Sequence, residues 1–188
     1  MNKLFPTLMV AVLLLFGFAG CGDKKDDANP ISAKDDYYLP VIYPSNFVDS
    51  ISNPYWPMTP GRTWKYEGTD NKVNETIDVE VLSETKTVMG VTCTVIRDRV
   101  YEDGSLVEDT QDWYAQDKQG HIWYMGEDVK NIEDGKVVDT KGSWEAGVDG
   151  AQPGIFMWAN PFPGAPYRQE YYAGEAEDWG QVPIFRTL

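Results

Sequence analysis

Alternation of apolar and polar side chains dominates the middle of the chain and predicts β-strands. In residues 76–82 every second side chain is apolar, which is the period of a strand with one buried face. Residues 62–67 are predicted to form a first strand, and residues 91–101 a longer strand with weaker alternation. No segment has apolar residues at helical spacing, so the pattern indicates an all-β fold.

Turn residues divide this region at nearly regular intervals. Asp-Gly pairs at 103–104 and 134–135, and the segment 117–120, place their glycines 16 and 15 residues apart. Asp-Gly is among the strongest short-range hairpin signals because glycine adopts positive φ readily. The spacing predicts an antiparallel β-meander, strongly twisted into a half-barrel or a sandwich, with long loops rich in Pro, Gly and aromatic residues.

Proline and glycine disrupt the strand pattern at both ends of this region. Residues 37–61 hold closely spaced prolines that exclude a helix, and we expect an irregular arm packed by its aromatic side chains. Residues 147–166 are predicted to form a long loop, and the segment "YRQEYYAG" after it is predicted to form another strand. The last residues show no pattern of a strand that would close the sheet. The domain that follows the arm is taken as residues 62–188.

The stretch "DWYAQDKQGHIWYM", residues 112–125, concentrates aromatic side chains around a turn. A three-residue loop with Gly120 left-handed makes Tyr114 and Tyr124 a direct cross-strand pair and leaves His121 opposite Asp117. In the same register Trp113 lies opposite Met125. Trp113 and Trp123 then share the other face diagonally.

Three interpretations of these aromatic residues stay open. The first is that the arm or the long loop covers the second aromatic face, so that the residues only stabilise the fold. The second is a platform for a sugar ring or another flat ligand, and the third is a protein-contact patch. The residues of the platform are Trp113, Trp123, Tyr114, Tyr124 and Trp158.

The first twenty residues have the features of an export signal. Lys3 precedes an apolar run of eleven residues, 8–18, which is shorter than the roughly 20 residues that a membrane-spanning helix needs. The run ends in Phe-Ala-Gly-Cys, which resembles the bacterial lipobox and implies cleavage before Cys21 and its modification by fatty acyl chains, palmitate among them. Residues 21–36 are then a charged, lipid-anchored and disordered tether.

Lipid attachment would hold the protein to a membrane surface of the bacterial cell envelope. Two or three acyl chains give stable anchoring, whereas one gives marginal binding. Gly22 rather than Asp follows the cysteine, and resemblance to the sorting rule of enteric-type bacteria favours the outer membrane, on its periplasmic or surface side. With Cys21 modified, Cys93 has no intrachain partner, and its β-branched neighbours indicate a small buried side chain.

The mature chain is strongly acidic. Removal of residues 1–20 removes Lys3 as the only charged side chain, leaving 15 basic against 30 acidic residues and a net charge of about −15. This charge disfavours binding to nucleic acid and to anionic lipid headgroups. The expected partners are the membrane, through the lipid anchor, and an unidentified protein or glycan ligand.

Catalytic and metal-binding motifs are missing from the sequence. It contains one His, no second free Cys, no calcium-binding loop pattern, no nucleophile elbow and no phosphate loop. We therefore expect no cofactor, no metal and no catalytic residues, and a non-catalytic role in binding. A hydrolase that uses two carboxylates stays open as an alternative, because 30 acidic residues offer many pairs.

Three segments of the chain are similar to an uncharacterised group of bacterial secreted proteins and lipoproteins. They are "NPYWPMTPGRTWKYEG", "VTCTVIRDRVYEDGSLVEDTQDWYAQDKQGHIWYMGEDV" and "GSWEAGVDGAQPGI" with the later "YRQEYYAGEAED". The resemblance spans residues 53–178 and implies no activity. Members continue for several more strands, whereas the last ten residues here depart from the pattern, so we expect a shortened or frame-shifted copy.

Overall fold

The computed structural model describes residues 38–70 and 72–184. All the described residues belong to one compact unit. The predicted signal peptide, the tether and Cys21 lie outside the described residues. None of the residues that the structure does describe forms a helix of the length and apolar character needed to cross a bilayer.

Twelve strands and one short 3₁₀-helix make up the described chain. In order they are η1 (Pro44–Asn46), β1 (Phe47–Val48), β2 (Thr63–Asp70), β3 (Val73–Val88), β4 (Val91–Glu102), β5 (Ser105–Asp117), β6 (Ile122–Glu133), β7 (Lys136–Asp139), β8 (Trp144–Glu145), β9 (Gln152–Met157), β10 (Pro166–Arg168), β11 (Glu170–Tyr171) and β12 (Trp179–Gln181).

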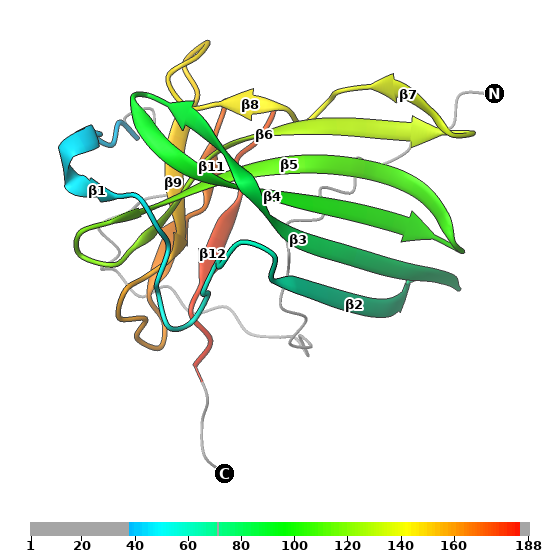
Figure 1. The fold of residues 1–188 in the computed structure, drawn as a ribbon, viewed down its shortest axis with the longest axis horizontal. Helices are drawn as coiled ribbons and strands as arrows, with labels where there is room; N and C mark the ends of the chain where they lie inside the picture. The colour runs from blue at the N-terminus through cyan, green and yellow to red at the C-terminus, as the bar shows by residue number, and fades with distance from the viewer. Residues whose placement is uncertain (1–37, 71, 185–188) are drawn as a thin grey trace, which may run out of the picture. The chain divides into compact units, whose positions relative to one another are not determined.

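Antiparallel strands form the main sheet, and those from β2 to β6 are consecutive, which confirms the all-β meander. Its central order is β11-β9-β6-β5-β4-β3-β2, and β1, β7 and β8 pair at its margins. Figure 1 shows β3 to β6 side by side as long curved strands, and the sheet curls into a half-barrel. The turns at 103–104 and 134–135 have positive φ at both residues, as tight hairpins require.

Three predictions about the loops are wrong. The segment 147–166 contains β9, because Pro153 and Gly154 are held extended between β6 and β11. The segment "YRQEYYAG" forms two short strands, β10 and β11, rather than one. The chain also has a closing element, since β12 pairs with β10 in a separate two-stranded sheet.

The two faces of the main sheet differ in burial. The inner face, defined here by Val79, Asp98, Thr110 and Val129 in one cross-strand row, lies against β9, whose Phe156 contacts Tyr114 of the sheet and Trp56 of the arm. In that packing Trp56 of the arm stacks on Trp64 at 5.5 Å between ring centroids.

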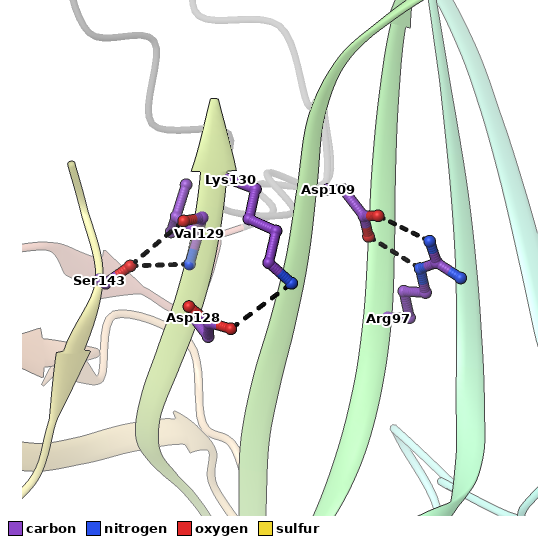
Figure 2. Close-up of polar contacts among 6 residues, drawn as sticks. All are labelled: Arg97, Asp109, Asp128, Val129, Lys130 and Ser143. Atoms are coloured by element: carbon purple, nitrogen blue, oxygen red, sulfur yellow. Dashed lines mark hydrogen bonds and ion pairs between the residues drawn. The ribbon is translucent and has the colours of Figure 1, made fainter. Parts of the chain in front are cut away.

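The outer face carries an alternating row of charges. Cross-strand neighbours across β2 to β6 are, in order, Lys65, Asp78, Arg99, Asp109 and Lys130. Figure 2 shows Arg97 pairing with Asp109 through two hydrogen bonds of 2.8 and 2.6 Å, and Lys130 reaching Asp128 at 3.6 Å. Opposite charges on neighbouring strands stabilise a sheet by roughly 0.2–1 kcal/mol a pair. This part of the face is therefore an ordinary solvated sheet surface.

Candidate functional site

Five carboxyl groups lie together on the inner face, a region that otherwise packs apolar side chains. They come from four strands that the sheet order brings close together: β4, β5, β6 and β11. The carboxyl cluster consists of Asp98, Glu108, Asp112, Glu127 and Glu170. Four of them are buried and Glu108 is half-buried. Buried acids are rare unless they are paired, so this cluster is the candidate site.

Asp112 and Glu127 form the centre of the carboxyl cluster. They are directly opposite each other in the register of β5 and β6. The Tyr124 hydroxyl donates a hydrogen bond of 2.5 Å to Asp112 Oδ1. Cross-strand neighbours have Cβ atoms about 4.5–5.5 Å apart, so the two acids interact directly.

Trp144 joins Glu127 to Glu170. Its indole Nε1 lies 3.1 Å from Glu127 Oε1 and 3.0 Å from Glu170 Oε2, so one N–H is shared by two carboxyl groups. Because both oxygens lie close to the same nitrogen, they are at most about 6 Å apart. Trp144 is placed there by β8, whose register sets it opposite Glu127.

Two oxygens of the carboxyl cluster lack a partner. Asp98 is 6% exposed and Glu170 is 0% exposed, yet Asp98 Oδ1 and Glu170 Oε1 accept no hydrogen bond from any described residue. At the more exposed end, Glu108 Oε1 accepts a hydrogen bond of 2.9 Å from the Thr110 hydroxyl. A buried polar atom without a partner costs about 1–3 kcal/mol, so the fold itself does not explain these two atoms.

Burial and mutual repulsion keep protons on these acids. Burial, followed by the charges of Asp112 and Glu108, raises the pKa of Asp98 to about 8. Burial, followed by the charge of Asp178, raises the pKa of Glu170 to about 8. Burial is also the largest cause of the raised pKa of Asp112 and Glu127, and it raises the pKa of Glu108.

No base offsets the repulsion within the described chain. In residues 38–70 and 72–184, no ion pair joins a Lys, Arg or His side chain to any member of the carboxyl cluster. Nor do these residues contain three or more acidic, His or Cys groups arranged to ligate a metal ion. The raised pKa values favour the protonated form of the carboxyl groups of the cluster, which can donate hydrogen bonds, or can release protons to solvent when a cation binds.

The predicted aromatic platform is divided between the two faces of the sheet. Tyr114 and Tyr124 stack on the inner face with ring centroids 4.7 Å apart, and both are buried. The hairpin register is correct for this pair but wrong for Trp113, which lies opposite Gly126 because a β-bulge adds Met125 to β6. Gly126 has φ of 137°, and a Cβ there would lie 2.5 Å from the Trp144 carbonyl oxygen.

On the outer face, the two tryptophans of the hairpin are covered by neighbouring segments. Trp113 is buried, and Lys86 Nζ lies 4.6 Å from the centre of its ring. Phe47 of β1 packs edge-on against Trp123, whose indole N–H donates a hydrogen bond of 3.0 Å to Asp117.

A shallow outer groove of about 590 Å³ lies next to Trp113. Lys86 crosses it to Glu145, with Nζ and Oε2 3.0 Å apart, so the protein's own side chains already occupy the face of Trp113.

The side chains of His121 and Trp158 contact each other, and no ring contact among the described residues joins Trp158 to the other residues of the predicted aromatic platform. The backbone of His121 pairs with Asp117, but its Nδ1 accepts a hydrogen bond of 3.0 Å from the Ala159 N–H. Its ring packs edge-on against half-buried Trp158 at 5.1 Å. His121 therefore lies opposite Asp117 as predicted, with its backbone N–H donating a hydrogen bond of 3.0 Å to Asp117 Oδ1, while its imidazole contacts the segment after β9 rather than the Asp117 side chain.

Cys93 is fully buried, as its β-branched neighbours predict. Burial raises the pKa of its thiol to about 12, so the nucleophilic thiolate is scarce at neutral pH.

Sequence reasoning missed every member of the carboxyl cluster. The signal that could have found Asp98 and Asp112 is the parity of the strand pattern. Asp98 alternates with Ile96 and Val100, and Asp112 with Tyr114, so each acid lies on the buried face. Glu127 could not be found in this way, because the bulge at Met125 reverses the parity of β6.

Comparison with models of protein families, with curated proteins and with solved structures gives no match for this chain. The site is therefore interpreted from its own geometry.

Proposed function

We propose that this chain is a lipid-anchored protein of the bacterial cell envelope whose β domain binds a ligand at the carboxyl cluster without catalysing a reaction. The observation that carries the binding proposal is the pair of unpartnered buried oxygens, Asp98 Oδ1 and Glu170 Oε1. Unsatisfied buried groups with strongly shifted pKa values are characteristic of functional sites.

The chemistry of the cluster supports binding over catalysis. A two-carboxylate hydrolase needs one protonated acid and one ionised carboxylate. Every member of the carboxyl cluster has a raised pKa, and no base within the described residues selects one of them for ionisation. His121, the only histidine of the chain, is engaged with Ala159 and serves no member of the cluster as a base.

The anchor is proposed from the N-terminal pattern alone. Cys21 follows Phe-Ala-Gly after an apolar run of signal-peptide length. Acylation of this cysteine would place the β domain at a membrane surface on a charged tether, within reach of ligands in the envelope.

Replacement of the two cysteines tests the anchor. We expect the native chain to sediment with membranes and to incorporate labelled palmitate, and Cys21→Ser to move to the soluble fraction without label. Cys93→Ala is the matched control and should stay in the membrane fraction. Retention of Cys21→Ser in the membrane would overturn the lipoprotein assignment.

A further inference from the structure

We propose that the carboxyl cluster binds an organic cation, a primary ammonium group on a slender chain that enters beside Glu108. This inference rests on the proposed binding function and names the chemical class of its ligand. It is carried by five acids on one face, by the absence of a base paired with them in the described chain, and by two unpartnered oxygens.

Charge selects the sign of the ligand. The ionisable groups that shift the pKa values of the cluster, or whose pKa values the cluster shifts, are all acids or phenols: Tyr66 on β2, Glu75 and Asp78 on β3, Asp98 on β4, Glu108, Asp112 and Tyr114 on β5, Tyr124 and Glu127 on β6, Glu170 on β11, and Asp178. The cation nearest to Glu170 in sequence, Arg168 on β10, is buried against the rings of Tyr38, Tyr171 and Trp179 and forms no ion pair with the cluster among the residues that the structure describes. An anion would be repelled here, whereas a cation would relieve the repulsion that the acids impose on one another.

The side chains around the acids suit an ammonium group. Its three N–H donors match carboxyl oxygens that are short of partners, such as Asp98 Oδ1. The stacked rings of Tyr114 and Tyr124, with Trp144 edge-on to Tyr124 at 5.3 Å, also place π-systems beside the acids. Aromatic rings near a desolvated cation contribute up to about 2 kcal/mol of attraction.

Exposure within the cluster indicates the direction of entry. Glu108 and its cross-strand partner Asn131 are half-buried, whereas Asp112 is buried and Glu170 is fully enclosed. The cluster therefore reaches solvent at the Glu108 end and is closed at the Glu170 end. Because the acids beyond Glu108 are buried, an ammonium on a slender chain of methylenes suits this arrangement better than a bulky cation.

Binding is expected to release protons, because pKa values of about 8 leave Asp98 and Glu170 largely protonated at pH 7 before the ligand arrives. An ammonium that binds a neutral carboxyl group leaves an ammonium–carboxylate pair and one proton in solvent. Affinity should accordingly rise as pH rises from 6 toward 8, until the carboxyl groups are already ionised in the free protein. An adventitious interaction with surface carboxylates would show no proton release, since those groups are ionised throughout this range.

Calorimetric titration of the full chain in mild detergent at pH 7 tests the proposal. The probes are 1,5-diaminopentane, Nα-acetyl-lysine amide, calcium chloride, maltose and citrate. We expect the two ammonium probes to bind and to release protons, measured by comparing two zwitterionic buffers that differ in ionisation enthalpy. The diamine binds more tightly if the natural ligand is a free amine, and the lysine probe if it is a protein side chain.

Single substitutions in β5 and β6 test whether the probes bind at the carboxyl cluster. Asp112→Asn should weaken diamine binding at least tenfold, about 1.4 kcal/mol. Asp128→Asn is the matched control, because Asp128 is adjacent to Glu127 but lies on the outer face, and it should bind like the native chain. If Asp112→Asn loses its near-ultraviolet circular dichroism, Asp98→Asn replaces it.

The remaining outcomes of the titration would overturn different parts of the proposal. Binding of maltose or citrate in place of the diamine, when it is sensitive to Asp112→Asn, overturns the cation class but keeps the ligand-binding function. Calcium binding in preference to the diamine overturns the organic ligand. No binding of any probe overturns both the cation proposal and the proposed binding function.

Discussion

Asp98 illustrates how strand geometry separates charges that are adjacent in the sequence. It lies between Arg97 and Arg99, but alternation along β4 directs both arginines to the outer face. Arg97 there pairs with Asp109, while Asp98 is left among acids on the inner face. A sequence in which acid and base are neighbours therefore produces a buried acid without a salt bridge.

The Asp98→Asn variant should be more stable than the native chain, and the gain should grow with pH. The unfolded pKa of Asp is about 3.9, whereas the folded pKa is about 8. Between these values the native state binds more protons than the unfolded state, so native stability falls as pH rises. Asparagine resembles the protonated acid and removes this slope, which raises Tm by roughly 2–4 °C for each kcal/mol recovered.

Thermal unfolding from pH 5 to pH 9, followed by circular dichroism, measures this effect. Asp128→Asn is again the control and should keep the native slope, because Asp128 is half-exposed on the outer face. An Asp98→Asn chain with the same dependence of Tm on pH as the native chain would contradict the burial of the acid.

The meander was predictable from the sequence because its strands carry a local signal. Strand β4 extends one residue beyond the predicted 91–101, and the Asp-Gly turns form as expected. Strand β9 was not predictable, because Pro153 and Gly154 favour a loop by local propensity. Pairing with β6 and β11, which are distant in sequence, holds them extended.

Substitution of Gly154 should destabilise the fold, because β9 and the β10–β11 segment are in close backbone contact there. A Cβ on Gly154 would lie 2.1 Å from the Gln169 carbonyl oxygen, and the obstacle is backbone that cannot rotate away. We expect Gly154→Ala to lower the free energy of unfolding by about 1–3 kcal/mol or more.

Urea unfolding of Gly154→Ala and Gly68→Ala measures the difference. Gly68 is also a strand glycine, but a Cβ there meets nothing within 4 Å. The control variant should unfold within about 0.5 kcal/mol of the native chain. Equal urea midpoints for the two variants would show that the backbones at Gly154 and Gln169 are not in close contact.

The candidate site was far less predictable than the strands. Its acids are spread over β4, β5, β6 and β11, and only the curled sheet brings them together. The contact between Glu127 and Glu170 depends on Trp144 of β8, a two-residue strand with no sequence signal of its own. Local patterning placed Tyr114 opposite Tyr124 but gave no information on which distant segments cover them.

Most of the tryptophan side chains in the described part of the chain are covered by neighbouring segments. Trp56, Trp113 and Trp144 are buried, and Trp179 is the tryptophan classed as exposed among the described residues, at 37%. This burial favours the interpretation that the aromatic residues of the 112–125 hairpin stabilise the fold over that of a sugar platform, because stacking on a sugar requires an accessible ring face.

Tryptophan fluorescence tests this distribution in solution. We expect a blue-shifted emission of which acrylamide quenches a minor part, and we expect no change on addition of a glycan panel. Trp179→Phe should remove much of the quenchable part, whereas Trp144→Phe should leave it unchanged. A glycan-dependent shift that Trp158→Ala abolishes would instead support a carbohydrate-binding module.

Because the carboxyl cluster is buried, the net charge of the folded protein at neutral pH differs from the net charge counted from the sequence. With pKa values of about 8, Asp98 and Glu170 are largely neutral at pH 7, and burial shifts the pKa of Glu127 in the same direction. Electrophoretic mobility therefore reports a less acidic protein than the residue count implies. When the pH rises above about 8, the buried carboxyl groups of Asp98 and Glu170 ionise and the net negative charge of the protein increases.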